Sequence, residues 1–315
     1  MWGYIGRRLL AFIPTIFVAI TLIFILTRLV PGNPVWALLG HQSVSAEQVD
    51  AVAREMGLDR PVLIQYLHWL PRVLSGNFGQ SIFYEKPVAA VIAERFPVTL
   101  SIAGLSTLLT VLLAVPAGVL AATRRDSALD HASMVISILG VSIPSFWLGF
   151  LFILLFAVTL GWLPPAGYRD LSFGFWEWLR RLVLPVLALS VSQLALLMRI
   201  TRTSMLEVLG QEYIVAARAK GLTEGKVIYK HALRNGLMSI TTIVGLAFAL
   251  TLGGSVIIEV VFAIPGLGRL ITDAAVRRDY ATLEGGMAYL TLIALAANLL
   301  VDISYSLINP RVRYE

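Results

Sequence analysis

The chain has 315 residues, of which 57% are hydrophobic and only 14% are charged, and its mean hydropathy is +0.80. Soluble globular domains carry about 25% charged residues, so this composition excludes that class and indicates an all-α, polytopic integral membrane protein. The net charge of +6 would suggest a nucleic-acid ligand in a soluble protein. In a membrane protein it follows from the excess of Lys and Arg in cytoplasmic loops, so we expect no nucleic-acid partner.

Six segments are apolar enough to be membrane spans, because about 20 apolar residues cross the hydrocarbon core. The region 131–168 has no Asp, Glu, Lys or Arg, and it is too long for one untilted helix. We therefore place the third span inside it, and we expect Pro185 to open the fourth span and Arg28 to snorkel at the end of the first. The predicted spans are residues 9–27, 98–123, 134–160, 182–198, 237–258 and 285–301.

The distribution of Lys and Arg predicts the orientation of these spans. The short segments expected on one side hold Arg7, Arg8, Arg124, Arg125, Arg311 and Arg313, together with the basic region around 199–236. Short loops rich in Lys and Arg face the cytoplasm, so both termini and the basic region are predicted to be cytoplasmic. The pair Arg7-Arg8 precedes an apolar run, as in a secretory signal, but no small-residue cleavage site follows before Pro31. We therefore interpret this run as the first span.

The longest hydrophilic insertion, residues 31–96, is predicted to be a small extracytoplasmic helical subdomain within one transmembrane domain, 1–315. Ser45 and Gln48 fit a capping box and Gly57 is a helix-ending residue, which predicts a short helix at 46–56. A second helix is expected from Pro61 to about residue 74. Its Tyr66 and Trp69 are residues typical of a membrane–water interface.

The segment 199–236 is the most informative part of the chain. It holds seven Lys or Arg and three Asp or Glu between two apolar spans, and charges at the bilayer centre cost about 2.5–3.5 kcal/mol each. The segment must therefore leave the membrane. We predict a short helix over 213–220 that Gly221 terminates, and a second helix from Thr223 to about Asn235.

The composition of the first short helix favours docking to a cytoplasmic partner. Its small Ala216, Ala217 and Ala219 allow close approach of another surface, and Arg218, Lys220 and Lys226 supply positive charge. The alternative interpretation is a solvated basic loop near anionic lipid headgroups. Charge does not separate the two, but the Ala and Gly spacing favours docking.

Motifs of enzymes, cofactor sites and metal sites are missing from the sequence. There is no GxxxxGK[ST] phosphate loop, and a GxSx start at Gly140 is followed by Pro144, which breaks the nucleophile-elbow pattern. The four histidines are isolated. We therefore expect no catalytic, cofactor-binding or metal-binding residue. Glu259 and Asp302 are the nearest candidates for buried ionisable groups; a structural role is favoured over a proton relay.

Many motifs in order make the chain similar to ABC-importer permeases, specifically the first-permease type of the dipeptide, oligopeptide and nickel importers. The motifs are RRLLAFIPT (7–15), LVPGNP (29–34), GNFGQS (76–81), RFPVTL (95–100), IPSFWLG (143–149), GWLP (161–164), Thr201-Arg202, EYIVAARAKGL (212–222), HALRN (231–235), GGSVIIE (253–259), PGLGRL (265–270), RRDY (277–280) and NPRVRY (309–314). The segment 212–222 resembles the family's EAA loop, the coupling helix that fits a cleft on the ATPase subunit.

The resemblance implies a subunit of an ATP-driven importer in the bacterial inner membrane. Its implied partners are a second homologous permease subunit, two ATP-binding subunits and an extracytoplasmic substrate-binding protein. The implied ATPase-coupling residues are Glu212, Tyr213, Ala216, Ala217, Arg218, Lys220 and Gly221. Two residues depart from the family pattern: Val215 stands in place of a Glu, and Ser239 in place of a Pro.

The implied cargo is di- or oligopeptides, and nickel chelates, glutathione, opines and sugars are the alternatives within the same family. A stand-alone secondary transporter is the rival class. It would be expected to show inverted repeats and ionisable residues at mid-membrane, and the sequence shows neither. Selectivity in such importers resides mostly in the binding protein, so no substrate-binding residue is named.

Overall fold

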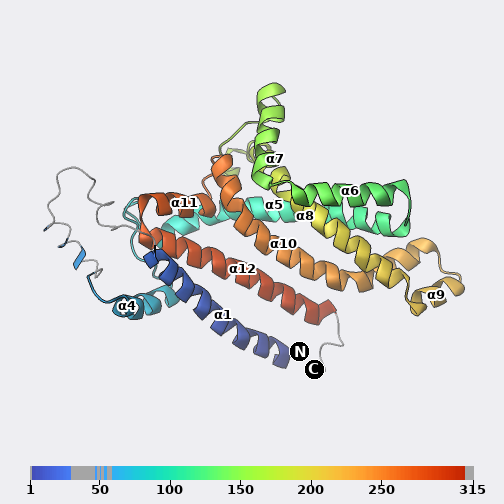
Figure 1. Cartoon of the computed structure of the whole chain (residues 1–315), viewed down its shortest axis with the longest axis horizontal. Helices are drawn as coiled ribbons and strands as arrows, with labels where there is room; N and C mark the ends of the chain where they lie inside the picture. The colour runs from blue at the N-terminus through green and yellow to red at the C-terminus, as the bar shows by residue number, and fades with distance from the viewer. Residues whose placement is uncertain (1, 30–46, 48–49, 51–52, 55–58, 309–315) are drawn as a thin grey trace. The chain divides into compact units, whose positions relative to one another are not determined.

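The computed structural model describes residues 2–29, 47, 50, 53–54 and 59–308, and its regular elements are helices (Figure 1). Within the described residues the only β-type pairing is an isolated bridge between Gln80 and Pro87. This confirms the predicted all-α class. The elements are α1 (Trp2–Leu29), α4 (Val62–Leu74), α5 (Val88–Thr123), α6 (Ala128–Ser142), α7 (Ser145–Phe152), η1 (Ile153–Thr159), η2 (Leu171–Phe173), α8 (Phe175–Leu209), α9 (Glu212–Ala219), η3 (Lys226–Ala232), α10 (Leu233–Val261), α11 (Leu267–Arg277) and α12 (Tyr280–Ile308).

Five helices, α1, α5, α8, α10 and α12, are long and apolar enough to cross a membrane. The predicted third span, 134–160, is wrong as a single helix: α6 ends at Ser142, and the pair α6 and α7–η1 is bent by 97°. Pro144 explains the break, because its ring disfavours helical backbone at the preceding residue and it has no N–H to donate. Ile143 is accordingly extended, with φ −94° and ψ 122°. Within the described residues there are six candidate spans if this bent pair counts as one.

Two spans extend well beyond the apolar segments that predicted them. α5 has 36 residues and α8 has 35, so each is about 50 Å long at 1.5 Å per residue, against a hydrocarbon core of about 30 Å. α5 begins at Val88, so the last residues of the predicted 31–96 insertion form its first turns. Pro185 lies inside α8, and the prediction that it opens this helix is wrong.

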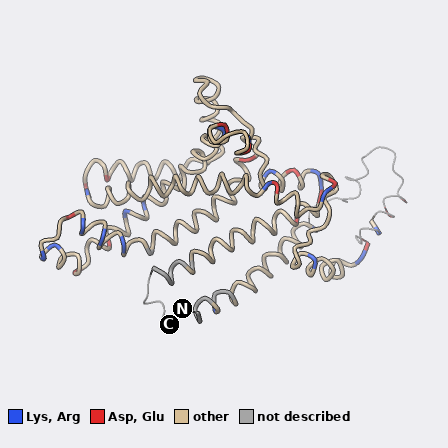
Figure 2. Tube along the Cα trace, turned by 180° about the vertical axis from the view of Figure 1, so that it is seen from behind, with Lys and Arg blue, Asp and Glu red and all other residues tan. Residues whose placement is uncertain are grey.

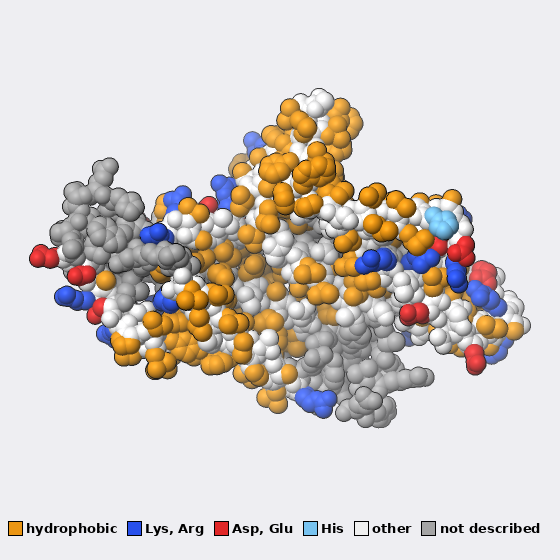
Figure 3. Space-filling model, viewed as in Figure 1, with side chains coloured by type: hydrophobic (Ala, Val, Ile, Leu, Met, Phe, Trp, Pro, Cys, Tyr) orange, Lys and Arg blue, Asp and Glu red, His pale blue; other side chains and the backbone are white. Residues whose placement is uncertain are grey.

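The chain divides into two compact units, and the first comprises residues 1–10, 100–264 and 294–315. In this unit α8 packs against both α6 and α10 (Figure 1). Glycines allow close contact: a Cβ at Gly140 of α6 would lie 2.7 Å from the Ala195 Cβ of α8, and a Cβ at Gly118 of α5 would lie 2.6 Å from the Thr201 Cβ. The α7–η1 arm carries exposed apolar side chains along its length (Figure 3).

The second unit comprises residues 11–99 and 265–293. The predicted helix from Pro61 is confirmed as α4, whereas the predicted helix at 46–56 falls mostly outside the described residues. The rings of Tyr66 and Trp69 face Phe24 of α1, with ring centroids 5.3 and 5.0 Å away. The first turns of α5 pack on α11 through a cluster of buried side chains, Val88, Val91, Ile92, Leu267 and Leu270.

Gly118 gives a direct test of the α5–α8 packing. In Gly118→Ala the new methyl group meets Thr201 and the Met198 carbonyl oxygen at 2.6–2.7 Å, and overpacking of this kind costs about 1–3 kcal/mol. We expect a lower unfolding temperature for the detergent-purified protein. Gly104→Ala, in the same helix with no atom within 4 Å of its Cβ position, is the matched control and should be neutral or slightly stabilising. Equal unfolding temperatures for the two variants would contradict the packing.

Candidate coupling site

The predicted short helix is present as α9, Glu212–Ala219, and it follows α8 after a two-residue turn. Gln211 before it is extended, Glu212 lies in its first turn and Arg218 in its last. These charges suit the helix dipole, which is positive at the amino end and negative at the carboxyl end. α9 is too short to be stable alone, since isolated helices below about 12–15 residues are marginal in water. Its position must come from contacts with the rest of the chain.

Gly221 ends α9 as predicted. The Gly221 N–H donates to the Arg218 carbonyl oxygen at 2.9 Å, and the Leu222 N–H donates to the Ala217 carbonyl oxygen at 3.4 Å. This pair of bonds is the Schellman motif, which requires a left-handed residue. Gly221 has φ +75°, a conformation that glycine adopts without steric cost.

The inner face of α9 is buried against the ends of three other helices. Ile214 is fully buried and Ala217 is 8% exposed. They belong to one apolar cluster, whose members are Val119 and Ala122 of α5, Met205 of α8, Ile214 and Ala217 of α9, and Val227 and Ala232 of η3. Of the seven predicted coupling residues, Ala217 therefore supports α9 from inside and does not lie on its surface.

The outer face of α9 is open. Glu212, Tyr213, Ala216, Arg218 and Lys220 are all exposed. Sequence reasoning treated Val215 only as a departure from a pattern, yet it is 59% exposed beside Ala216. Helical spacing could have shown this, because positions 212, 215, 216 and 219 share one face, opposite to 214 and 217. This face is a low apolar strip with charged residues at its edges.

Polar contacts join α9 to the following helix at the surface. The Arg218 guanidinium donates to both Glu224 carboxylate oxygens at 2.8 and 3.3 Å, and Asn235 Nδ2 donates to the Tyr213 hydroxyl at 3.0 Å. Exposed ion pairs contribute little, about 0–1 kcal/mol, so the apolar cluster beneath α9 dominates its placement. Lys and Arg gather around α9 and the adjoining ends of α8 and η3 (Figure 2).

The second predicted helix of this segment has no end at Asn235, and that part of the prediction is wrong. Helical structure runs from Glu224 through η3 into α10 and ends at Val261. The part at Lys226–Ala232 is a π-helix, a form that often occurs at functional sites. α9 is thus followed by only a short turn before a helix that is itself a membrane span.

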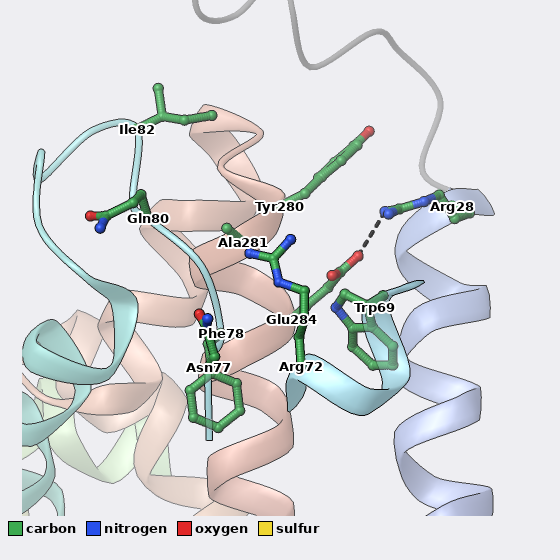
Figure 4. A pocket seen from close by; sticks show the side chains of 10 residues that line it. All are labelled: Arg28, Trp69, Arg72, Asn77, Phe78, Gln80, Ile82, Tyr280, Ala281 and Glu284. Atoms are coloured by element: carbon green, nitrogen blue, oxygen red, sulfur yellow. Dashed lines mark hydrogen bonds and ion pairs between the residues drawn. The ribbon is translucent and has the colours of Figure 1, made fainter. Parts of the chain in front are cut away.

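A second polar site lies in the other unit, around a pocket of about 170 Å³ (Figure 4). The buried Glu284 carboxylate of α12 accepts hydrogen bonds from Thr27 Oγ1 at 2.9 Å and Arg28 Nη1 at 2.7 Å. Arg28 Nε also donates to the Gln65 side chain of α4 at 3.1 Å. Arg28 therefore pairs with Glu284 inside the protein. The prediction that its side chain snorkels towards the interface does not describe this contact. The contact joins α1, α4 and α12, and sequence reasoning missed it because its partners are 256 residues apart.

The predicted candidates for buried ionisable groups give a mixed result. Glu259 near the end of α10 is fully buried, whereas the Asp302 side chain is outside the described residues. Three buried carboxylates that the sequence did not single out are Asp130, Asp279 and Glu284. Asp279 accepts hydrogen bonds from Ser81 at 2.6 Å and Thr282 at 2.7 Å at the start of α12.

Comparison with known proteins covers the whole chain. Residues 114–314 match the family described as binding-protein-dependent transport system inner membrane component, and residues 1–103 match its N-terminal family. The chain is 43% identical over 315 residues to a putative peptide transport system permease protein of Brucella abortus (strain 2308). It is 38% identical over 315 residues to the glutathione transport system permease protein of Escherichia coli (strain K12). Both alignments cover 100% of each chain.

Solved structures share the fold. A chain of the inward-facing MetNI methionine ABC transporter superposes with a TM-score of 0.57 at 18% identity, covering 70% of this chain and 96% of that one. At this identity the match supports the fold alone.

The conformation of Gly221 predicts which substitutions disturb the end of α9. A left-handed residue with a side chain costs about 1–2 kcal/mol, and a β-branched one is the least tolerant. Gly221→Val should therefore raise amide hydrogen exchange at residues 217–222 by roughly tenfold. Gly221→Asn is the control, because Asn tolerates this region. Equal exchange in the two variants would show that the left-handed turn does not hold the helix end.

Proposed function

Because this chain belongs to the family of binding-protein-dependent transport system inner membrane components, we propose that it forms a translocation pathway for short peptides with a second, homologous permease subunit. It is a multi-pass inner-membrane permease of an ABC importer and a transport component, not an enzyme. ATPase and binding-protein partners follow from that membership. The relatives named for peptide transport support this choice of cargo. The alternative cargo is glutathione, for which another relative is named, or a nickel chelate, an opine or a sugar.

The helix α9 is the proposed contact with one of two ATP-binding subunits. The observation that carries this is the open strip of small residues on α9, above a base that is buried in the ends of α5, α8 and η3. Glu212, Tyr213, Ala216, Arg218 and Lys220 lie on the exposed side and supply the contact. Ala217 and Gly221 fix the helix beneath it. Such a helix can transmit force because it cannot move without the helix ends that bury it.

The proposed mechanism is a two-state change driven by the ATP-binding subunits. When they close on ATP, they draw together the α9 helices of the two permeases, and the spans move from an inward-open to an outward-open state. ATP binding biases the equilibrium because the closed ATPases fit only one spacing of the two helices. Each α9 would carry the ends of α5, α8 and η3 with it.

The proposed orientation places both termini and the segment 199–236 in the cytoplasm. The segment 31–96 is then extracytoplasmic, where it helps to receive the binding protein. The distribution of Lys and Arg supports this orientation. The experiment on Ala216 tests it as well, since ATP-binding subunits reach only cytoplasmic segments.

Substitution of Ala216 tests the coupling role. A bulky side chain on the exposed strip should prevent close approach of the ATPase, so Ala216→Trp should lose most co-purification of the ATP-binding subunits while membrane insertion stays normal. Ala128→Trp is the matched control: it is an exposed alanine at the start of α6, outside α9. Normal ATPase recovery and normal ATP-driven uptake in Ala216→Trp would exclude α9 as the contact.

A further inference from the structure

A buried ion pair joins α6 to α8 at the end of the first unit that also holds α9. Both Asp130 carboxylate oxygens accept hydrogen bonds from Arg202, one from Nε and one from Nη2, the latter at 2.7 Å. The Asp130 side chain is fully buried and that of Arg202 is 19% exposed. Asp130 Oδ2 also accepts a hydrogen bond from the Asp126 N–H at 3.1 Å. One carboxylate thus connects α8, the first turn of α6 and the turn between α5 and α6.

Adhesion of the two helices does not require this pair. α6 and α8 already meet where a Cβ at Gly140 would lie 2.7 Å from the Ala195 Cβ. Replacing a buried ion pair by apolar residues is often neutral or stabilising, so net stability is a weak reason for two buried charges. The paired, planar geometry of guanidinium and carboxylate does restrain distance and orientation together. Gly140 therefore allows α6 and α8 to lie close together, and the ion pair fixes their relative orientation.

Arg202 lies on α8 next to the apolar cluster that buries the inner face of α9. Its neighbour Thr201 is fully buried and packs where Gly118 of α5 has no side chain. Met205, one turn further along α8, belongs to the apolar cluster that buries Ile214 and Ala217. A displacement of α9 thus reaches Arg202 through packed side chains on α8. The ion pair between Arg202 and Asp130 then connects that displacement to the first turn of α6.

The ion pair at Asp130 gives α6 a second point of contact with α8, in addition to the contact at Gly140. Asp130 and Gly140 are ten residues apart on α6, about 15 Å at 1.5 Å per residue. A helix held at two points this far apart follows its partner in rotation as well as in translation. At its far end α6 turns through the break at Ile143-Pro144 into α7, where Gly149 lies against Phe262 at the end of α10.

We propose that Asp130 and Arg202 are positioning residues that make α6 move as one body with α9 and the adjoining ends of α5 and α8. This inference rests on the proposed coupling role of α9 and adds the route by which its movement reaches the bent α6–α7 segment. The proposal gives the motif Thr201-Arg202 a role in positioning α6, separate from contact with the ATPase.

Spin labels on the complete transporter, with its ATPase subunits, test the proposal without a known substrate. The chain has no cysteine, so the pair Ala132→Cys and Lys226→Cys places one label on α6 and one on η3. The distance between the labels is measured without nucleotide and with nucleotide trapped by vanadate. With Asp130 and Arg202 intact, one narrow distance is expected in both states. In the neutral double variant Asp130→Asn/Arg202→Gln, the distribution of label-to-label distances in the vanadate-trapped state should change. It should shift or broaden by more than the width of the distribution in the native protein.

Two further variants separate positioning from simple stability. Arg202→Lys keeps the charge but loses the two-pronged contact, so it should broaden the vanadate distance even where the protein assembles normally. Lys86→Gln/Glu94→Gln removes an exposed ion pair of 3.1 Å and should leave both distances unchanged. A native distance that already differs between the two states overturns the proposal, as does a native-like distance in both Asp130/Arg202 variants. Failure of the α9 contact itself would appear separately, as normal ATPase recovery in Ala216→Trp.

Discussion

Burial of Ile214 and Ala217 is the constraint on which the rest of this structure depends. An eight-residue helix cannot hold itself, and its surface ion pair with Glu224 is worth too little to do so. Its inner face is instead buried with Val119, Met205 and Val227. The small residue at position 217 lets α9 lie close, and Gly221 turns the chain directly after it. The same contacts position α9 and join it to three helix ends, so the support of α9 and its proposed role in transmitting force have one cause.

The elements that the sequence predicted well are those with local signals. Blocks of apolar residues located the spans, Pro61 marked the start of α4, and Gly221 marked the end of α9. Hydropathy missed the full length of α5 and α8, because it marks only the part of a helix that lipid surrounds, and it passed over the break at Pro144 because both halves are apolar. Arg28 with Glu284 and Arg202 with Asp130 could not be predicted, since each pair joins residues far apart in the chain. Helical spacing distinguishes the inward Ala217 from the outward Ala216, whereas the alanines of α9 were predicted together as one docking surface.

Three of the buried carboxylates share a common arrangement. Glu284 is met by Arg28 and Thr27, Asp279 by Ser81 and Thr282, and Asp130 by Arg202 and the Asp126 N–H. A charge in an apolar bundle is costly unless it is paired and hydrogen-bonded. In the first unit the Asp130–Arg202 pair lies beside the apolar cluster under α9. There its directional hydrogen bonds orient helices that apolar packing already holds close. The apolar cluster fixes where α9 lies, and the Asp130 pair fixes how α6 is oriented on α8.

Photo-cross-linking along α9 in the assembled transporter tests the central claim most directly. A photoreactive residue is placed in turn at each position from 212 to 220, and the cross-linked products are identified. Products with the ATP-binding subunits are expected at the exposed positions 212, 213, 215, 216, 218, 219 and 220, whereas 214 and 217 should react only within this chain. The result that would contradict the account is no ATPase product at any exposed position, or equal products at all nine, since α9 would then be free of the ATPase or not held by its inner face.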